Sequence, residues 1–473
     1  MKAWLTLTAE LGQVDGPFLS PNGKAKIGAC LKTRLDLTRQ KEPARTQDRS
    51  RKSAYSSRKR EHTICLVITL IVRSCMVDEE YAWRLAQELV RIDSSDPGAF
   101  EGQVEAFIKE HIERHVKESP SPILQRIAIE ELEVLPGRKN LMITVPGTDD
   151  EARLVYICHM DTVTLGEGWD SDIDPLGAQI RNDNLYGRGS CDMKGGLACA
   201  IAALINLLDL VAATDRLPRR GFSLICSVDE EDFMRGVEAA IDAGWVGGHE
   251  WVLDTEPTDG QIQVAHKGRT WFEIDMAGMT AHASQPWKGA DAVAGMAEVV
   301  SGIRRAVAAL PAHHELGRST VTFGQIEGGY RPYVVPDHAK VWIDMRLVPP
   351  ANTTLATQIV EQVIAQAEEE IPGVHGTYKI TGDRPPIERD PASPLLAALK
   401  AAADHVTETD TEIGFFTGYT DTAVIAGTCG NRNCMSYGPG SLALAHKPNE
   451  HVPHADIRRC QQVLIRLTEN TLW

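Results

Sequence analysis

Histidine and acidic residues stand directly after several apolar runs of this sequence. The clearest case is L-V-Y-I-C-H-M-D-T-V, from Leu154 to Val163, in which His159 and Asp161 follow an apolar run. Side chains two positions apart on an extended strand point to the same side, so these two would project together from the end of a buried strand. In open α/β sheets, ligands bind at the carboxyl ends of the strands. A core histidine with a chance acidic neighbour is the alternative that this segment alone leaves open.

Further acidic and histidine side chains occupy similar positions. Asp192 lies in G-R-G-S-C-D-M-K-G-G, a glycine-rich loop that enters a long apolar helix, where a helix cap is its alternative role. The run S-V-D-E-E-D ends a second buried strand with the acids 229–232, and V-L-D-T-E-P-T ends a third with Asp254 and Glu256. His446 stands in A-L-A-H-K-P-N-E near the C-terminus.

Together these segments predict a divalent metal centre. They offer two histidines and at least three carboxylates, a mixed nitrogen and oxygen ligand set that suits zinc or a similar ion. Acidic side chains crowded into one turn repel one another unless cations offset them. A solvated acidic loop explains residues 229–232 poorly, because these charges directly follow an apolar strand. Two cations about 3.5–4 Å apart, bridged by one carboxylate, are a recurring hydrolytic arrangement.

The elements that must position these residues alternate between helices and strands. Helices are predicted at 78–92, 101–118 and 195–213, strands at 126–134, 140–147, 153–158, 221–228 and 251–253, and a hairpin at 181–188. This order predicts an α/β fold with a mixed, mostly parallel sheet and helices on both of its faces.

The pattern changes near residue 262. A strand pair at 262–276 is followed by a helix at 291–310, strands at 319–326 and 338–346, a helix at 353–370 and a strand at 377–381. This succession is close to a ferredoxin-like sandwich. We therefore expect a catalytic domain of residues 76–262 and 385–473, interrupted by an inserted domain of residues 263–384 that ends at a hinge, Arg384-Pro385-Pro386.

Composition narrows the class of protein. A net charge of −16 argues against a nucleic-acid binder, and residues 1–75 alone are basic, with 15 Lys and Arg against 6 Asp and Glu. We interpret residues 1–75 as a disordered basic extension or a mis-assigned start. Their apolar run, Thr63 to Val72, is about half the length that a membrane helix needs, so no membrane partner is expected. The ten cysteines form no C-x-x-C pair, which indicates reduced thiols and a cytoplasmic location.

In their order along the chain, these motifs resemble the dinuclear zinc peptidase and deacylase family that includes acetylornithine deacetylase, succinyl-diaminopimelate desuccinylase, carboxypeptidase G and aminoacylase. The resemblance covers about residues 76–473 and implies two zinc ions per subunit, with Co²⁺ or Mn²⁺ as alternatives. By this resemblance, His159 and Glu256 belong to one metal site, Glu231 and His446 belong to the other, and Asp192 bridges both. Asp254 remains a weaker candidate for the place of Glu256.

The resemblance also implies three roles beside the metals. Glu230 would be the general base, and Asp161 would fix the imidazole of His159 from behind. In G-M-T-A-H-A-S-Q-P, His282 would reach across a homodimer to stabilise the oxyanion that develops during the reaction.

Two further residues would contact substrate. Arg346 in D-M-R-L-V-P stands where the family grips a substrate carboxylate, and Asp421 ends F-T-G-Y-T-D, which resembles the substrate-side loop. One position departs from the family pattern, because Tyr333 replaces an asparagine whose amide is expected to hold substrate.

The implied activity is metal-dependent amide hydrolysis that removes the acyl group from a small N-acylated amino acid, as in acetylornithine deacetylase. A succinyl-diaminopimelate desuccinylase, or a dipeptidase or carboxypeptidase acting on short peptides, is the alternative within the same chemistry. A catalytically silent relative would be expected to lack Glu230 or a ligand, and none is missing. A serine hydrolase would need G-x-S-x-G at a strand-to-helix turn, and the sequence has none.

Overall fold

The computed structural model describes residues 77–473, so the predictions for residues 1–75 lie outside the described residues. The described chain opens with two helices, α4 (Tyr81–Val90) and α5 (Gly102–Glu118), close to the ranges that the sequence predicts. Buried residues of α4 recur at helical spacing, among them Trp83, Ala86 and Val90, so one face of this helix packs on the body of the protein.

The larger sheet is mixed and has the strand order β15-β10-β16-β9-β4-β8-β3-β2. The adjacent strands β16, β9, β4 and β8 run parallel to one another. At one end, β3 is antiparallel to β8 and β2 is antiparallel to β3, and at the other end β10 is antiparallel to β16 and parallel to β15. The strands are β2 (Ala128–Leu135), β3 (Arg138–Val145), β4 (Leu154–His159), β8 (Phe222–Ser227), β9 (Trp251–Asp254), β10 (Ile262–His266), β15 (Ile413–Phe416) and β16 (Cys434–Ser436). This is the predicted mixed, mostly parallel arrangement.

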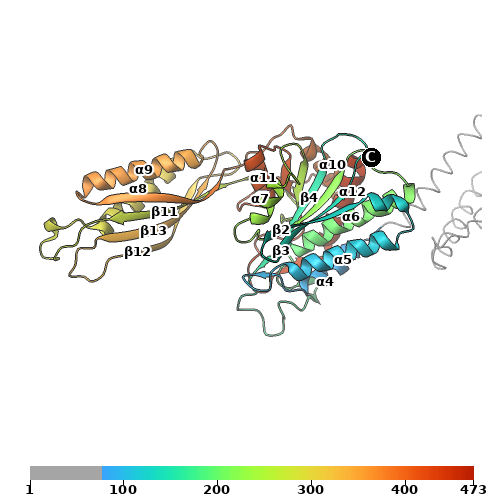
Figure 1. The fold of residues 1–473 in the computed structure, drawn as a ribbon, viewed down its shortest axis with the longest axis horizontal. Helices are drawn as coiled ribbons and strands as arrows, with labels where there is room; N and C mark the ends of the chain where they lie inside the picture. The colour runs from blue at the N-terminus through green and yellow to red at the C-terminus, as the bar shows by residue number, and fades with distance from the viewer. Residues whose placement is uncertain (1–76) are drawn as a thin grey trace, which may run out of the picture. The chain divides into compact units, whose positions relative to one another are not determined.

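Helices cover both faces of this sheet (Figure 1). In β4, Tyr156 and Cys158 belong to a core built with α4, α6 (Lys194–Thr214), α10 (Pro394–Thr407) and α12 (His454–Leu472). The alternate residues Val155 and Ile157 belong to a second core, built with α7 (Arg235–Asp242) and α11 (Asp421–Cys429). Strand side chains alternate between faces, so a strand buried on both sides must be apolar throughout, as β4 is until His159.

Helix α6 forms the centre of the first core. Within the described residues it is the one helix that is long and apolar enough to cross a membrane by length and composition, with a mean hydropathy of 2.1. However, 78% of that apolar stretch is buried inside the protein, against α4, α12 and β4. An all-round apolar helix is expected at such a position, because neighbours surround it on every side.

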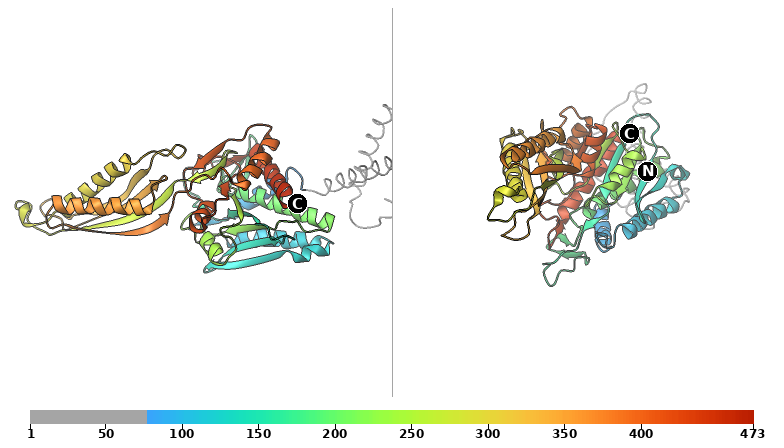
Figure 2. Two further views of the ribbon diagram at one scale, coloured as in Figure 1. Left: turned by 90° about the horizontal axis from the view of Figure 1, so that it is seen from above. Right: turned by 60° about the vertical axis from the view of Figure 1, so that its left-hand side comes forward.

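A second, smaller unit lies between β10 and α10 in the chain. Its four antiparallel strands have the order β12-β13-β11-β14, and both of its helices lie on the same side of this sheet (Figure 2). The elements are β11 (Gly268–Ala277), α8 (Ala292–Ala309), β12 (Thr320–Gly328), β13 (His338–Leu347), α9 (Thr353–Glu370) and β14 (His375–Arg384). The residues of β11 and β13 alternate between buried and partly exposed, which gives the helices one apolar sheet face. This is the predicted ferredoxin-like sandwich.

One strand was assigned to the wrong sheet by the sequence pattern. The predicted pair at 262–276 consists of β10 and β11, and β10 pairs with β15 and β16 of the larger sheet. The physical difference is visible in burial, because every residue of β10 is buried whereas β11 alternates. The break between them falls at Lys267.

Short strands in the connecting segments form two further small sheets. The predicted hairpin is formed by β6 (Gln179–Arg181) and β7 (Asn184–Tyr186), and β17 (His451–Pro453) pairs with β7. The short strands β1 (Ser95–Asp96) and β5 (Thr162–Val163) pair in parallel.

Candidate metal centre

The predicted ligands follow the parallel strands of the larger sheet. His159 is the last residue of β4, Glu230 and Glu231 follow β8, and Glu256 follows β9. Because β8, β4 and β9 are adjacent and parallel, their carboxyl ends meet at one edge of the sheet. This is the position at which open α/β sheets bind ligands.

A first group consists of His159, Asp192 and Glu256, whose candidate ligand atoms all lie within 4.8 Å of one another. Nε2 of His159 lies 3.3 Å from Oδ1 of Asp192 and 3.6 Å from Oε1 of Glu256. All three residues are buried.

Two glycines allow the loops of this group to approach β9. A Cβ atom added to Gly196 would lie 2.2 Å from the carbonyl oxygen of Thr255, and one added to Gly438 would lie at the same distance from that oxygen. No larger residue fits at either position without a backbone shift. The start of α6, which follows Asp192, is thereby packed directly against the residue that precedes Glu256.

A second group consists of Asp192, Glu231 and His446, again within 4.8 Å of one another. Nε2 of His446 lies 2.9 Å from Oε2 of Glu231 and 3.3 Å from Oδ2 of Asp192. The two oxygens of Asp192 therefore face one histidine each. The side chain of His446 is 52% exposed, so this side of the centre is open to solvent, whereas the first group is enclosed.

Asp161 supports the centre in a different way from the predicted one. The backbone carbonyl of Asp161 lies 2.9 Å from Nδ1 of His159, whereas the nearest oxygen of its carboxylate is 3.7 Å away. The carboxylate accepts the backbone N–H groups of Glu230 and Glu231, at 3.2 and 3.0 Å. Asp161 thus orients the imidazole through its main chain and the acidic loop through its side chain.

Glu450 and Arg188 are two supporting residues that the sequence reasoning missed. Oε1 of Glu450 accepts the backbone N–H groups of Cys191 and Asp192, at 2.9 and 3.1 Å. Oε2 of Glu450 lies 2.6 Å from Nη1 of Arg188, and both side chains are almost fully buried. Glu450 closes the segment A-L-A-H-K-P-N-E, so an acid four residues after His446 was the available signal; nothing in the sequence pointed to Arg188.

The electrostatics of the centre favour a bound cation. Burial raises the pKa of Glu230 and of Glu256 well above the usual value, and neighbouring carboxylates add to the effect. Hydrogen bonds to the carboxylates of Asp192 and Glu231 raise the pKa of His446 to about 10. Burial opposes a charge on His159, but the surrounding carboxylates outweigh it and hold its pKa well above the usual value. Divalent ions would supply the positive charge that these groups otherwise take up as protons.

A third acidic group, Asp96, Glu101 and Asp161, already has its cation within the chain. Nη2 of Arg138 lies 2.7 Å from Asp96 and forms an ion pair with Glu101, and Nη1 lies 3.2 Å from Asp229. We therefore assign this group to the support of the loop rather than to a metal.

Two further acids, the alternative ligand Asp254 and the substrate-side Asp421, form hydrogen bonds with buried hydroxyl groups. Oδ2 of Asp254 accepts the hydroxyl of Thr422 at 2.7 Å, so the geometry favours Glu256 over Asp254 as the ligand. Oδ2 of Asp421 accepts the hydroxyl of Ser227 at 2.6 Å, and burial raises the pKa of Asp421 to about 6. The substrate contact suggested for Asp421 stays a prediction.

Two predicted residues of the smaller unit make no contact with the groups above among residues 77–473. His282 is exposed, and its Nδ1 lies 2.9 Å from the hydroxyl of Ser284. Arg346 lies on β13, and its Nε donates to Oδ1 of Asp344 at 2.9 Å. Their roles at the oxyanion and at the substrate carboxylate stay predictions.

Comparison with known proteins places this arrangement in a family. Residues 155–470 match the model of peptidase family M20/M25/M40. A Staphylococcus aureus protein named "Probable succinyl-diaminopimelate desuccinylase" is 26% identical over 321 residues, which cover 62% of this chain and 77% of that protein. Acetylornithine deacetylase of Myxococcus xanthus is 25% identical over 335 residues, covering 69% and 82%.

Solved structures show the same fold. The crystal structure of aminopeptidase PepT from Bacillus cereus superimposes with a TM-score of 0.65 at 21% identity, and the match covers 83% of this chain and 99% of that one. Because the family match spans well over half of the 473 residues, this chain belongs to peptidase family M20/M25/M40 and is a hydrolase of amide bonds.

Proposed function

We propose that this protein is a dinuclear zinc-dependent amidohydrolase that removes the acyl group from N-acylated amino acids. The observation that carries the proposal is the pair of ligand groups joined at Asp192, one with His159 and Glu256 and the other with Glu231 and His446. Two such groups with a shared carboxylate fit two divalent ions held side by side.

The residues present fit such ions on chemical grounds. Each group combines one imidazole with carboxylate oxygens, which are ligands that zinc accepts, and Co²⁺ or Mn²⁺ would accept the same set. Oε1 of Glu231 is buried and has no hydrogen-bond partner among the described residues, which is costly unless a cation contacts it. When bound, the two ions would lower the pKa of a coordinated water and stabilise negative charge on the substrate's carbonyl oxygen.

The proton transfers are proposed to run through Glu230. Its carboxylate would take the proton of the attacking water and deliver it to the nitrogen of the leaving amine. Burial raises the pKa of Glu230 in the metal-free protein, and the neighbouring cations would keep the carboxylate ionised. Asp161 supports this role because it holds the backbone N–H of Glu230 and so fixes the loop. A positioned acid–base group of this kind typically contributes about 10²–10⁴-fold to the rate.

The relatives' names support an N-acyl amino acid as substrate. One is named a desuccinylase and one a deacetylase, at about equal identity. We propose acetylornithine deacetylase-like activity, with succinyl-diaminopimelate desuccinylase-like activity as the alternative, because both remove an acyl group from an amine by the same chemistry. Family membership also keeps short peptides among the candidate substrates.

The remaining proposals concern assembly and location. We infer a homodimer in which the exposed His282 completes the partner's site, a substrate carboxylate contact at Arg346, and a cytoplasmic location. The seven cysteines of the described part are all free thiols, which supports a reducing compartment. Sedimentation equilibrium would test the dimer, and mixing a His282→Ala variant with a Glu230→Gln variant should restore part of the activity if the sites are shared.

One experiment tests the proposed function directly. The protein is stripped with a chelator, reloaded with zinc or cobalt, and incubated with acetyl-, succinyl- and peptidyl-amino acids, with ninhydrin detection of the released amine. We expect metal-dependent amine release from an N-acyl amino acid, and release at least about 10²-fold slower from the Glu230→Gln control. If the reloaded protein released amine from no substrate, or if the stripped protein were as active as the reloaded one, the proposal would fail.

A further inference from the structure

Three arginines lie side by side across the smaller unit's sheet. Arg269 of β11 is directly opposite Arg346 of β13 on one side and Arg384 of β14 on the other. Directly opposite residues of antiparallel strands point to the same face, and like charges in that relation destabilise a sheet. Three adjacent arginines therefore destabilise the sheet unless anions neutralise their positive charges.

Two of the three arginines have an acidic partner within the chain. Arg346 pairs with Asp344 at 2.9 Å, and Nη2 of Arg384 lies 2.6 Å from Oε1 of Glu238. Arg269, between them, makes no ion pair among residues 77–473, and its Nε is buried without a hydrogen-bond partner there.

The surroundings of Arg269 offer its guanidinium an aromatic ring and two like charges. Its guanidinium carbon stands over the ring of Trp271, 4.2 Å from the ring centroid. Burial lowers the pKa of Arg269, and the neighbouring Arg346 and Arg384 lower it further. A stacked guanidinium with free N–H groups is preorganised to bind a planar anion through two hydrogen bonds.

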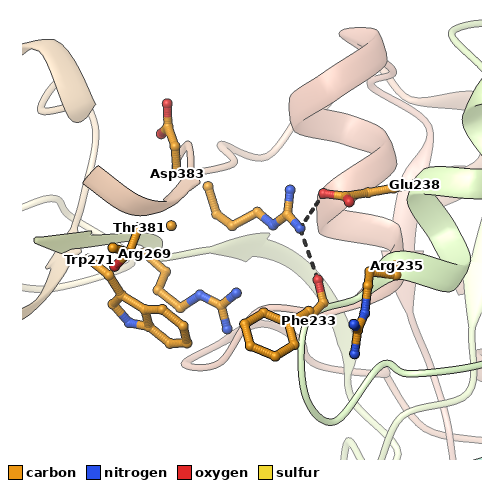
Figure 3. Close-up of a pocket in the computed structure, with 9 residues that line it drawn as sticks. Phe233, Arg235, Glu238, Arg269, Trp271, Thr381 and Asp383 are labelled. Carbon is orange, nitrogen blue, oxygen red and sulfur yellow. Dashed lines mark hydrogen bonds and ion pairs between the residues drawn. The ribbon is translucent and has the colours of Figure 1, made fainter. Parts of the chain in front are cut away.

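Arg269 and Arg384 line a pocket of about 410 Å³ together with Trp271 and Phe233 (Figure 3). This volume is within the range of small-molecule sites. Phe233 belongs to the segment that begins with Glu230 and Glu231, so the pocket adjoins the acidic loop of the metal centre. Glu230 opposes the lowering of the pKa of Arg269, which is consistent with this proximity.

The third arginine of the pocket, Arg235, is already neutralised. Its Nε lies 2.5 Å from Oδ2 of Asp229, and its Nη2 lies 3.6 Å from Asp232.

Two acids also line the pocket: Glu238 pairs with Arg384, and Asp383 accepts the hydroxyl of Thr353. Among the pocket's arginines, the one without an ion-pair partner in residues 77–473 is Arg269, with the N–H groups of Arg384 beside it.

We propose that Arg269 and Arg384 form a subsite for a substrate carboxylate that is remote from the scissile amide. This inference rests on the proposed amidohydrolase function and narrows its substrate class to N-acyl amino acids with an additional carboxylate. Within that function it favours the desuccinylase-like alternative over acetylornithine deacetylase-like activity, because acetylornithine has no carboxylate besides the one on its α-carbon. That carboxylate could belong to the acyl chain, as in a succinyl group, or to the side chain of an acidic amino acid. Both sources present the same planar anion to the arginines.

The test compares substrates that differ only in that carboxylate. The zinc-loaded full chain is given N-succinyl-L-alanine and its neutral succinamoyl analogue, and separately N-acetyl-L-glutamate and N-acetyl-L-glutamine. The variants are Arg269→Gln, Arg269→Lys, and Arg305→Gln as a matched loss of one exposed arginine on α8. The ratio of kcat/KM between the acid and the neutral compound is measured for each protein.

We expect the wild type to prefer the acid in one pair and Arg269→Gln to lose that preference by about 10- to 100-fold, as for one charge-assisted hydrogen-bonded contact. Arg269→Lys should retain part of the preference, because it keeps the charge but not the planar fork. Arg305→Gln should behave as the wild type does. The pair that responds identifies which half of the substrate carries the carboxylate. Unchanged ratios in Arg269→Gln would overturn the inference.

A binding measurement separates this inference from the proposed function. If no compound is hydrolysed, the proposed function fails, and succinate and succinamate are titrated calorimetrically into the same zinc-loaded proteins. Succinate should bind the wild type at least about 10-fold more tightly than Arg269→Gln, whereas succinamate should not distinguish them. Equal succinate affinities would overturn the subsite. Should Arg269→Gln fail to fold, the Arg269→Lys comparison decides, and there an unchanged acid preference would overturn it.

Discussion

Replacement of Glu450 by glutamine tests the support of the Asp192 loop. The Glu450 carboxylate is buried and serves three donors, the backbone N–H groups of Cys191 and Asp192 and the guanidinium of Arg188. Glutamine preserves the shape of the side chain but removes its charge and replaces one acceptor oxygen with an NH₂ donor. At least one of the three donors must then lose its acceptor, and Arg188 loses its counter-charge.

The contacts of Arg188 and Glu450 set the expected loss of unfolding free energy in Glu450→Gln. Removal of one partner from a buried ion pair typically costs about 3–5 kcal/mol of unfolding free energy. Arg188 would keep backbone carbonyl acceptors at Thr164 and Leu165, 3.0 and 3.2 Å away. We therefore expect the lower end, about 3 kcal/mol. Because the loop carries Asp192, zinc affinity should also fall by about 10- to 100-fold, as is usual when the partner of a ligand is removed.

Urea unfolding of the chelator-treated protein, followed by circular dichroism, measures the loss of unfolding free energy. Zinc titration measures the loss of zinc affinity. Glu131→Gln is the matched control. The Glu131–Lys109 ion pair has the same 2.6 Å separation as the Glu450–Arg188 pair, but its side chains are 28% and 32% exposed, respectively. Solvent screens that pair, so its loss should cost less than about 1 kcal/mol.

Two results would refute this reasoning. One is that Glu450→Gln loses less than about 1 kcal/mol of unfolding free energy at an unchanged dependence on urea concentration, and binds zinc about as tightly as the wild type. The other is an equal loss in Glu131→Gln, because burial would then not be the cause of the difference.

Three further predictions concern the metal centre. Glu230→Gln should keep both zinc ions and lose about 10²–10⁴-fold in kcat, and near-normal turnover would remove Glu230 from the mechanism. After dialysis, metal analysis should find about one zinc per chain in Glu231→Gln and less than one in Asp192→Asn, because Asp192 belongs to both ligand groups. Equal zinc content in the two variants would contradict the shared role of Asp192. The raised pKa of His446, about 10, keeps it protonated in the metal-free protein below that pH. Zinc must displace this proton, so affinity should rise with pH between about 6 and 9, with calorimetry detecting proton release; a pH-independent affinity would count against the ligand set.

Much of the fold and of the ligand set could be predicted from the sequence. Apolar runs of strand length that end in His159 or Glu256 identify strands buried on both faces, because only such strands are apolar at every position. The glycines around Asp192 likewise indicate a tight turn into a helix. These signals are local, and each depends on a few consecutive residues.

The strand pair 262–276 shows that local sequence does not decide which sheet a strand joins. Both of its strands are apolar enough for a core, and only their hydrogen-bonded partners assign β10 to the larger sheet and β11 to the smaller one. The partner of β10 in β15 lies more than a hundred positions away along the chain, and pairing at such a distance leaves no mark in a single sequence.

The sequence by itself determined which side chains could bind metal ions and which strands would present them. Only the tertiary structure decided that Asp192 faces His159 with one oxygen and His446 with the other, that Arg188 neutralises Glu450, and that Arg269 stands between two more arginines. The physical reason is that charges interact through distance and burial, and neither quantity exists until the segments that carry them have packed together.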